Sequence, residues 1–207
     1  MKLKVSKKKS KMSWAIGNGE SRLGLDLNSL TDNKIGCNAL YRDYHVDHLI
    51  CVDRRMLNEA LDSGFNNYGK IYTRPDWFRK QKNVRLVPEL PYVGSDRWDD
   101  PWHWGAGPFA VLLAAKYTKV KEVNLLGFDL HSKTNNVNNI YKDTPNYISA
   151  DKRAVDPRYW IYQISKIFEL FPDVNFRVYN LPDWQAPKSW IRPNVLVDKI
   201  SNLYYTI

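Results

Sequence analysis

The stretch Glu122-Val-Asn-Leu-Leu-Gly-Phe128 decides the fold. Val123, Leu125, Leu126 and Phe128 make it apolar almost without a break, which is typical of a central strand covered on both faces. Such strands belong to parallel sheets with helices on either side. Because two parallel strands need a long crossover between them, helices should alternate with strands along the rest of the chain.

The remaining segments alternate as this argument requires. Further strands are expected at 13–16, 34–37, 46–53, 70–73, 84–87 and 175–181, and helices at 54–63, 75–81, 109–117 and 154–171. The tail from Pro182 is expected to wrap the surface. The chain of 207 residues is long enough for one substantial core. The predicted fold class is therefore α/β, a single doubly wound, mostly parallel, Rossmann-like sheet.

The chain opens on a basic segment. Residues 1–11 contain six of the lysines behind the net charge of +9. We expect a flexible N-terminal arm at 1–11 followed by one nucleotide-binding domain at 12–207. Such an arm attracts nucleic acid or another polyanion through non-specific electrostatics, and a merely solubilising leader is the equal alternative.

Composition also indicates in which cellular compartment the protein is expected. No apolar run approaches the ~20 residues of a membrane span, and the start is too polar for a secretory signal. Cys37 and Cys51 fall in apolar, strand-like segments, where a free cysteine behaves as a small hydrophobe. These features predict a cytoplasmic protein with no membrane partner.

The first motif with chemistry is Gly17-Asn18-Gly19-Glu20-Ser21, directly after the first expected strand. Glycines let the backbone approach a ligand closely, and a following helix start offers free N–H groups to a phosphate. Gly17, Asn18, Gly19 and Ser21 are therefore predicted nucleotide contacts. No third glycine stands at the spacing of the dinucleotide fingerprint, and an ordinary turn is the alternative.

Two further motifs should face the same crevice. Asn38 ends the second strand, where a side-chain amide points toward ligands in parallel sheets, unless it only terminates the strand. Gly105, Ala106 and Gly107 precede Pro108 and an apolar helix. The exposed amides there can hold an anion, and a tight connection forced by sterics is the other interpretation.

Asp129 and His131 follow the decisive strand. A carboxylate at the carboxyl end of such a strand can hold a ribose hydroxyl, or a metal ion if other oxygens join it. His131 can act as an acid, a base or a phosphate partner, or can be an inert loop histidine. The asparagine-rich segment at about 132–147 is expected to be a long mobile loop that serves as a lid.

The order of these motifs resembles a known superfamily. Ile16–Ser21, Gly36–Asn38, Gly105–Gly107 and Lys121–Asp129 are similar in sequence and spacing to the Campylobacter-type bacterial sialyltransferases (glycosyltransferase family 42) and to the DUF115 or MptE-like proteins. The resemblance implies a Rossmann-like fold. It also implies that Asn18, Ser21 and Asn38 contact the nucleotide, with Gly105–Gly107 and Asp129 lining the same pocket.

The chain departs from the sialyltransferase pattern at three places. Glu20 replaces the loop proline, and His131 replaces the tyrosine two residues after the strand aspartate. Residues 147–156 contain no histidine where the family has its catalytic one. The resemblance therefore supports the pocket more than the chemistry, and His131, Asp151 or Tyr141 could supply the acid or base. We predict His131 and Asp129 as the catalytic residues.

Three functions follow as hypotheses. The leading one is a glycosyltransferase-like enzyme that uses a nucleotide-sugar donor. The second is an MptE-like pyrophosphokinase that needs Mg²⁺ held by Asp53 and Asp129. The third is a non-catalytic protein on the same fold that binds nucleic acid or sits in an assembly.

Overall fold

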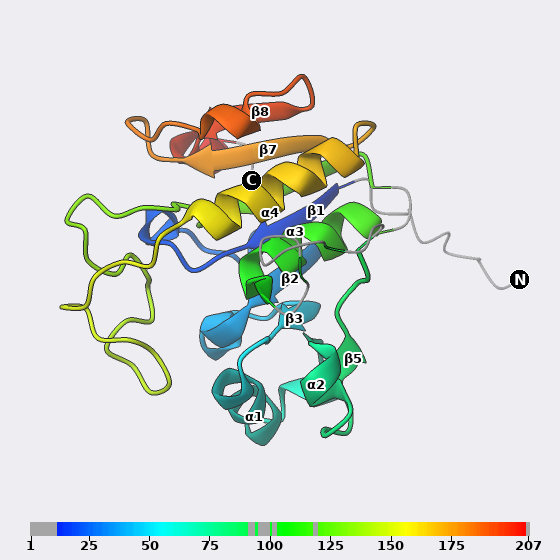
Figure 1. The fold of residues 1–207 in the computed structure, drawn as a ribbon. Coiled ribbons are helices and arrows are strands. Elements are labelled where there is room, and N and C mark those ends of the chain that lie inside the picture. Colours follow the sequence, from blue (N-terminus) through cyan, green and yellow to red (C-terminus); the bar gives the residue numbers. More distant parts are fainter. Residues whose placement is uncertain (1–11, 91–93, 95–99, 101–102, 118–119, 206–207) are drawn as a thin grey trace, which may run out of the picture.

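A single sheet of eight parallel strands runs through the protein (Figure 1). The structure is a computed structural model that describes residues 12–90, 94, 100, 103–117 and 120–205. The strands are β1 (Met12–Ile16), β2 (Asn33–Cys37), β3 (His48–Ile50), β4 (Lys70–Thr73), β5 (Arg85–Leu86), β6 (Glu122–Leu126), β7 (Asn175–Asn180) and β8 (Val195–Lys199). The helices are α1 (Arg54–Asp62), α2 (Pro75–Phe78), α3 (Ala106–Lys116) and α4 (Arg158–Leu170), with short 3₁₀ turns η1 (Glu20–Arg22), η2 (Asn38–Arg42), η3 (Phe65–Asn67), η5 (Lys188–Trp190) and η6 (Ile200–Tyr205).

The strand order reverses at β1. Reading across the sheet, the order is β5-β4-β3-β2-β1-β6-β7-β8, so the chain first winds outward from β1 on one side and then continues on the other. Ile16 at the end of β1 pairs with Gly36 of β2 and with Leu126 of β6. The doubly wound α/β class expected from the sequence is confirmed. In such sheets the crevice for ligands lies beyond the carboxyl ends of the strands at this reversal.

Both faces of the sheet are covered. Val123 and Leu125 of β6 pack into one core with α3 and α4, whereas Leu126 packs into a second core with α1, η2 and η6. Helix α3 is buried over nearly its whole length because the sheet covers one side and α4 the other. Figure 1 shows α3 and α4 together on the near face of the sheet.

Several elements begin or end one to four residues from the expected positions, and two differences change how a segment is assigned. The tail after Pro182 was expected only to wrap the surface, but it contributes β8, which pairs in parallel with β7. Helix α3 begins at Ala106 rather than at Phe109, because Gly107 and Pro108 fit the first helical turn. The second difference places the glycine motif inside the helix start rather than before it.

A long excursion at 127–157 connects β6 to α4. Among its residues the only strand-like pairing is an antiparallel bridge between Asn136 and Arg153. Figure 1 shows it extending from the side of the sheet to which the arrow of β7 points. None of the helices in the described ranges is both long and apolar enough to cross a bilayer. The predicted N-terminal arm lies outside the described residues.

Candidate functional site

A cavity of about 580 Å³ lies beyond the carboxyl ends of β1, β2 and β6. We call it the first cavity. Most of the predicted site residues line it, although they come from five separate segments of the chain. These are Gly17, Asn18, Gly19, Asn38, Asp53, Gly105, Ala106, Gly107, Asp129 and His131.

Glycine is required at two facing positions on the floor of the first cavity. Gly17 donates its N–H to the carbonyl of Leu126 at 2.7 Å, so the turn after β1 stays in contact with the end of β6. A Cβ on Gly17 would lie 2.4 Å from the carbonyl oxygen of Gly127. Gly127 itself has φ +69°, and its own Cβ would lie 2.7 Å from the Gly17 carbonyl oxygen. The two backbones can meet only because both side chains are absent.

Asp129 fastens the glycine turn. Its carboxylate accepts hydrogen bonds from the backbone N–H of Ser21, at 2.8 Å, and from the Ser21 hydroxyl. A Cβ on Gly19 would lie 2.5 Å from the Asp129 carboxyl carbon, which explains the second glycine of the motif. Ser21, predicted as a nucleotide contact, does not line the first cavity and instead lines a second one. Asp129 therefore holds the glycine turn in position through Ser21.

The two carboxylates of the Mg²⁺ hypothesis differ in their availability. Asp53 and Asp129 both line the first cavity, but the Asp129 carboxylate is already bonded to Ser21. Within the described ranges, no group of three or more His, Cys, Asp or Glu side chains is placed to share a metal ion. Mg²⁺ usually takes one or two carboxylates together with waters and substrate phosphates, so Asp53 is the carboxylate of this pair that remains available to it.

The Asn18 side chain is engaged at both ends. Its amide nitrogen donates to the Cys37 carbonyl at 3.0 Å and to the Tyr147 hydroxyl at 3.1 Å. Its carbonyl oxygen accepts from Arg22 at 3.3 Å. Since an asparagine amide has two N–H groups, both of its donors are used within the protein.

Strained backbone marks the cavity wall. Leu130 has φ +68°, in the left-handed region that bulky residues rarely adopt, whereas Asn38, with φ +52°, is of a residue type that tolerates this region. Among the described atoms, the Asn38 side-chain oxygen is buried and has no hydrogen-bond partner. Strained residues and unpaired polar atoms concentrate at functional sites, and here both line one cavity.

The start of α3 faces the same space. Gly105 precedes the helix and donates its N–H to the Gln163 side chain at 3.3 Å. The next two N–H groups, of Ala106 and Gly107, belong to the first turn, where no intrahelical acceptor exists. They carry the positive end of the helix dipole toward the cavity. Such groups can hold an anion, and anion binding at this helix start stays a prediction.

His131 is exposed and lines the cavity. Its backbone N–H donates to the Asp129 carbonyl at 2.8 Å, and its carbonyl accepts from the Asn138 side chain at 3.0 Å. Two hydrogen bonds therefore fix the backbone of His131 where the residue lines the cavity. By contrast Tyr141 and Asp151, the other acid/base candidates, line neither cavity.

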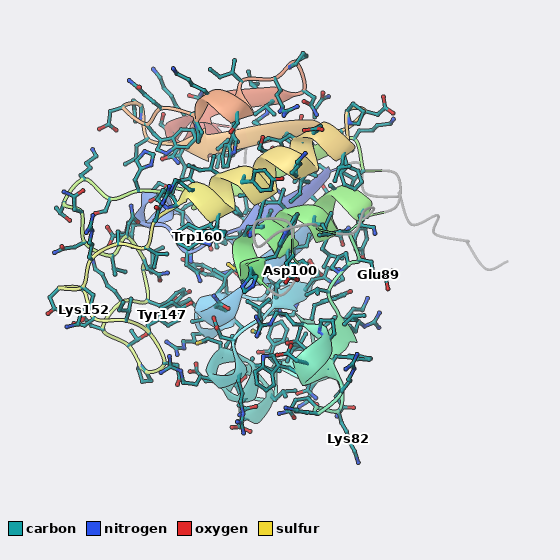
Figure 2. All side chains as sticks on the ribbon, viewed as in Figure 1. Lys82, Glu89, Asp100, Tyr147, Lys152 and Trp160 are labelled. Carbon is teal, nitrogen blue, oxygen red and sulfur yellow. The ribbon has the colours of Figure 1, made fainter. Side chains whose placement is uncertain are left out.

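The excursion docks onto the glycine turn. Ile140 donates its N–H to the Asn18 carbonyl at 2.9 Å, and the buried Tyr147 hydroxyl accepts from Asn18 and from the Ala39 N–H at 3.4 Å. Burial raises the pKa of Tyr147 above its ordinary value, so the hydroxyl stays protonated at neutral pH. Figure 2 shows Tyr147 and Trp160 on the side from which the excursion extends. In this structure the segment is tethered, and its opening remains a prediction.

Arg42 provides the second tether. Its guanidinium donates to the Thr144 hydroxyl at 2.8 Å and to the Pro145 carbonyl at 2.9 Å. Glu59 of α1 accepts from both Arg42 and Asn146. These contacts join residues 144–146 of the excursion to α1.

Several residues of the site escaped the sequence reasoning. Arg22 is buried and donates to the Gly17 carbonyl at 2.8 Å as well as to the Asn18 side chain. Its charge therefore lies next to two residues that line the cavity. An arginine shortly after a turn resembles any surface cation, and no sequence signal marks it. The cavity lining also includes Arg74, His103, Trp104, Tyr147 and Trp160.

The two cysteines are free and buried. Cys37 lines the first cavity, and burial raises its pKa to about 12. A thiol with so high a pKa is a poor nucleophile at neutral pH, so the cavity contains no activated cysteine at that position.

The fold and the crevice together define a doubly wound α/β protein with a cavity at the reversal of strand order. Neither the family models nor the curated proteins contain a match to this sequence. Among solved structures, the chain is similar to the apo crystal structure of an alpha-2,3-sialyltransferase from Campylobacter jejuni. The identity is 14%, the TM-score is 0.52, and the match covers 97% of this chain and 94% of that one. At this identity the likeness is one of fold.

Proposed function

We propose that the protein is a glycosyltransferase-like enzyme whose nucleotide-sugar donor binds in the first cavity. One observation carries the proposal: the glycine turn after β1, Asn38 after β2 and the start of α3 converge on a single cavity at the reversal of strand order. Crevices at this position are the general ligand site of open α/β sheets. The shared fold with a sialyltransferase agrees with this class of function.

The cavity offers distinct chemistry for each part of such a donor. The N–H groups of Ala106 and Gly107 suit the phosphate, because they are unpaired within the helix and lie at its positive end. The unpartnered Asn38 oxygen suits a hydroxyl or amino donor of the nucleoside. Trp104 and Trp160 supply apolar and aromatic wall for a base.

His131 would act where charge develops. As the acceptor oxygen bonds to the anomeric carbon, the bond from that carbon to the phosphate oxygen breaks. The acceptor's proton passes to water, and negative charge grows on the departing phosphate. The imidazole of His131, which lines the cavity, would donate a hydrogen bond to the departing oxygen and stabilise that charge.

The test is a panel of CMP-, UDP- and GDP-linked sugars. Calorimetry measures binding, and chromatography follows release of the free nucleotide with and without Mg²⁺. We expect one nucleotide class to bind saturably and its sugar conjugate to be turned over without Mg²⁺. Absence of binding by every member, from a protein shown to be folded by circular dichroism, would overturn the proposal.

A further inference from the structure

Exposed cations without a carboxylate partner gather at the end of the sheet formed by β3, β4 and β5. Seven lysines and arginines between residues 53 and 85 are exposed and form no ion pair with a described carboxylate. Only Asp53 and Asp62 oppose them, because arginines engage the other two carboxylates of this stretch. We call the seven the basic surface: Arg54, Arg55, Lys70, Arg79, Lys80, Lys82 and Arg85.

Trp77 of α2 brings together cations from two elements of the basic surface. Arg54, at the start of α1, and Lys80, just after α2, lie 5.9 Å and 5.0 Å from the centroid of its ring. The indole N–H donates to the Val52 carbonyl at 3.2 Å and so holds the ring next to the end of β3. The attraction of a cation to an aromatic face therefore helps to position these charges.

The elements that carry the basic surface are neighbours. The Gln81 side chain donates to the Asn58 side chain at 2.9 Å, which links the segment after α2 to α1. Figure 1 shows α1, α2 and β5 at the same end of the sheet, and Figure 2 shows the Lys82 side chain pointing away from the ribbon there. The charges thus belong to one end of the molecule.

An aromatic ring is exposed beside these cations. Phe78 ends α2 and is 42% exposed, directly before Arg79 and Lys80. Within the described ranges its ring has no aromatic or cationic partner, whereas Tyr68, also exposed, packs against Phe65 and His45. Phe78 therefore offers a free aromatic face next to unpaired positive charge.

We infer that the basic surface binds single-stranded nucleic acid, with phosphates at its lysines and arginines and a base stacked on Phe78. Single strands combine a regular row of negative charges with exposed aromatic faces, and proteins bind them through cations and aromatic rings together. A duplex hides the faces of its bases. An anionic membrane matches the charges, but one exposed phenylalanine gives little apolar area to insert.

The inference goes beyond the proposed function and does not depend on it. The experiment measures fluorescence anisotropy of a labelled uridine dodecamer, titrated with the full chain at several salt concentrations. The same strand annealed to its adenosine complement is the duplex arm. We expect tighter binding of the single strand than of the duplex, and an affinity that falls as salt rises.

Charge variants separate the basic surface from residues 1–11, which contain six further lysines. The triple variant Arg79→Gln, Lys80→Gln, Lys82→Gln should make the slope of log affinity against log salt shallower by about 2, since each lost phosphate contact on a single strand contributes about 0.7. The control Arg153→Gln, Lys188→Gln, Lys199→Gln also removes three exposed cations, and it should leave the slope unchanged.

Two variants at Phe78 test the stacking. Phe78→Leu keeps an apolar side chain without a ring and should weaken binding of the single strand by about five- to 150-fold, as expected for one lost base stack. Phe78→Tyr keeps the ring and should bind like the parent protein. Circular dichroism checks that each variant is folded.

Three results would overturn the inference. They are a duplex bound as tightly as the single strand, equal slope changes in the two triple variants, and a Phe78→Leu variant that binds like the parent. Vesicles of phosphatidylcholine and phosphatidylserine form a further arm. If the charge variant at residues 79–82 releases the protein from vesicles while its affinity for the uridine strand is unchanged, the surface is a membrane contact instead.

Discussion

Gly17 and Gly127 approach each other so closely that neither can carry a side chain. A Cβ on either residue would lie within 2.7 Å of the other's carbonyl oxygen. The two glycines directly follow β1 and β6, the neighbouring strands at which the strand order reverses. The floor of the first cavity therefore depends on this glycine pair.

Gly127→Ala should lower the free energy of unfolding by ~2–4 kcal/mol, since the left-handed backbone strain and the clash with Gly17 add together. Gly24→Ala is the matched control, because Gly24 has φ +80° and nothing within 4 Å of its added Cβ. Urea unfolding measures both. Equal losses in the two variants would show that the close approach contributes nothing.

Tyr147→Phe should tighten nucleotide binding. The Tyr147 hydroxyl accepts from Asn18, which lines the first cavity, and from the Ala39 N–H, so it occupies a donor of Asn18 that a ligand oxygen could use. Removing one competing hydrogen bond is worth ~0.5–1.5 kcal/mol, so we expect an increase of about two- to ten-fold in affinity by calorimetry. Weaker binding in the variant would instead make Tyr147 a direct ligand contact.

His131→Ala should reduce turnover by roughly ten- to ten-thousand-fold with little change in donor affinity, as expected for lost electrostatic or acid–base assistance. Because His131 is exposed, removal of its ring should lower the free energy of unfolding only slightly. His45→Ala is the control, because His45 is also exposed and lines neither cavity. Equal turnover in the two variants would rule out a role for His131 in the reaction.

His48 should make the protein sensitive to acid. Burial, with a smaller contribution from Lys70, lowers its pKa to about 4 from an ordinary 6.5, and its ring bonds to the Tyr117 hydroxyl. Between these two pH values the unfolded chain binds the extra proton, so stability is complete above about pH 6.5 and falls as the pH approaches 4. The full difference corresponds to roughly 3 kcal/mol.

Unfolding in urea at pH 7.5 and pH 4.5 checks this expectation. His48→Gln should flatten the dependence on pH, whereas His45→Gln should keep it. A parent protein with the same stability at both pH values would contradict the assignment.

The sequence predicts the sheet well where the signal is local. The largely apolar run of β6 can be recognised from adjacent residues alone, and the glycine turn directly follows β1. Strand β8 was missed because Val195–Lys199 is half exposed and does not alternate between buried and exposed residues, so it lacks the usual period.

The site was predictable only in part for a related reason. Asn18, Asn38 and the helix start are marked by the ends of their own elements. The contact between Asn18 and Tyr147 spans 129 residues of sequence, and nothing near either residue indicates it. The burial of Arg22 likewise arises from tertiary packing against Tyr44 and Tyr141.

The central claim is that nucleotide binds in the first cavity, and the glycine amides provide the most direct test. Gly17, Gly19, Gly105, Gly107 and Gly127 line that cavity, whereas Gly24, Gly64 and Gly69 do not. In ¹H–¹⁵N spectra recorded during titration with the nucleotide that binds by calorimetry, the first group should shift saturably and the second should not move. Saturable binding that leaves the first group unchanged would place the nucleotide elsewhere and contradict the account.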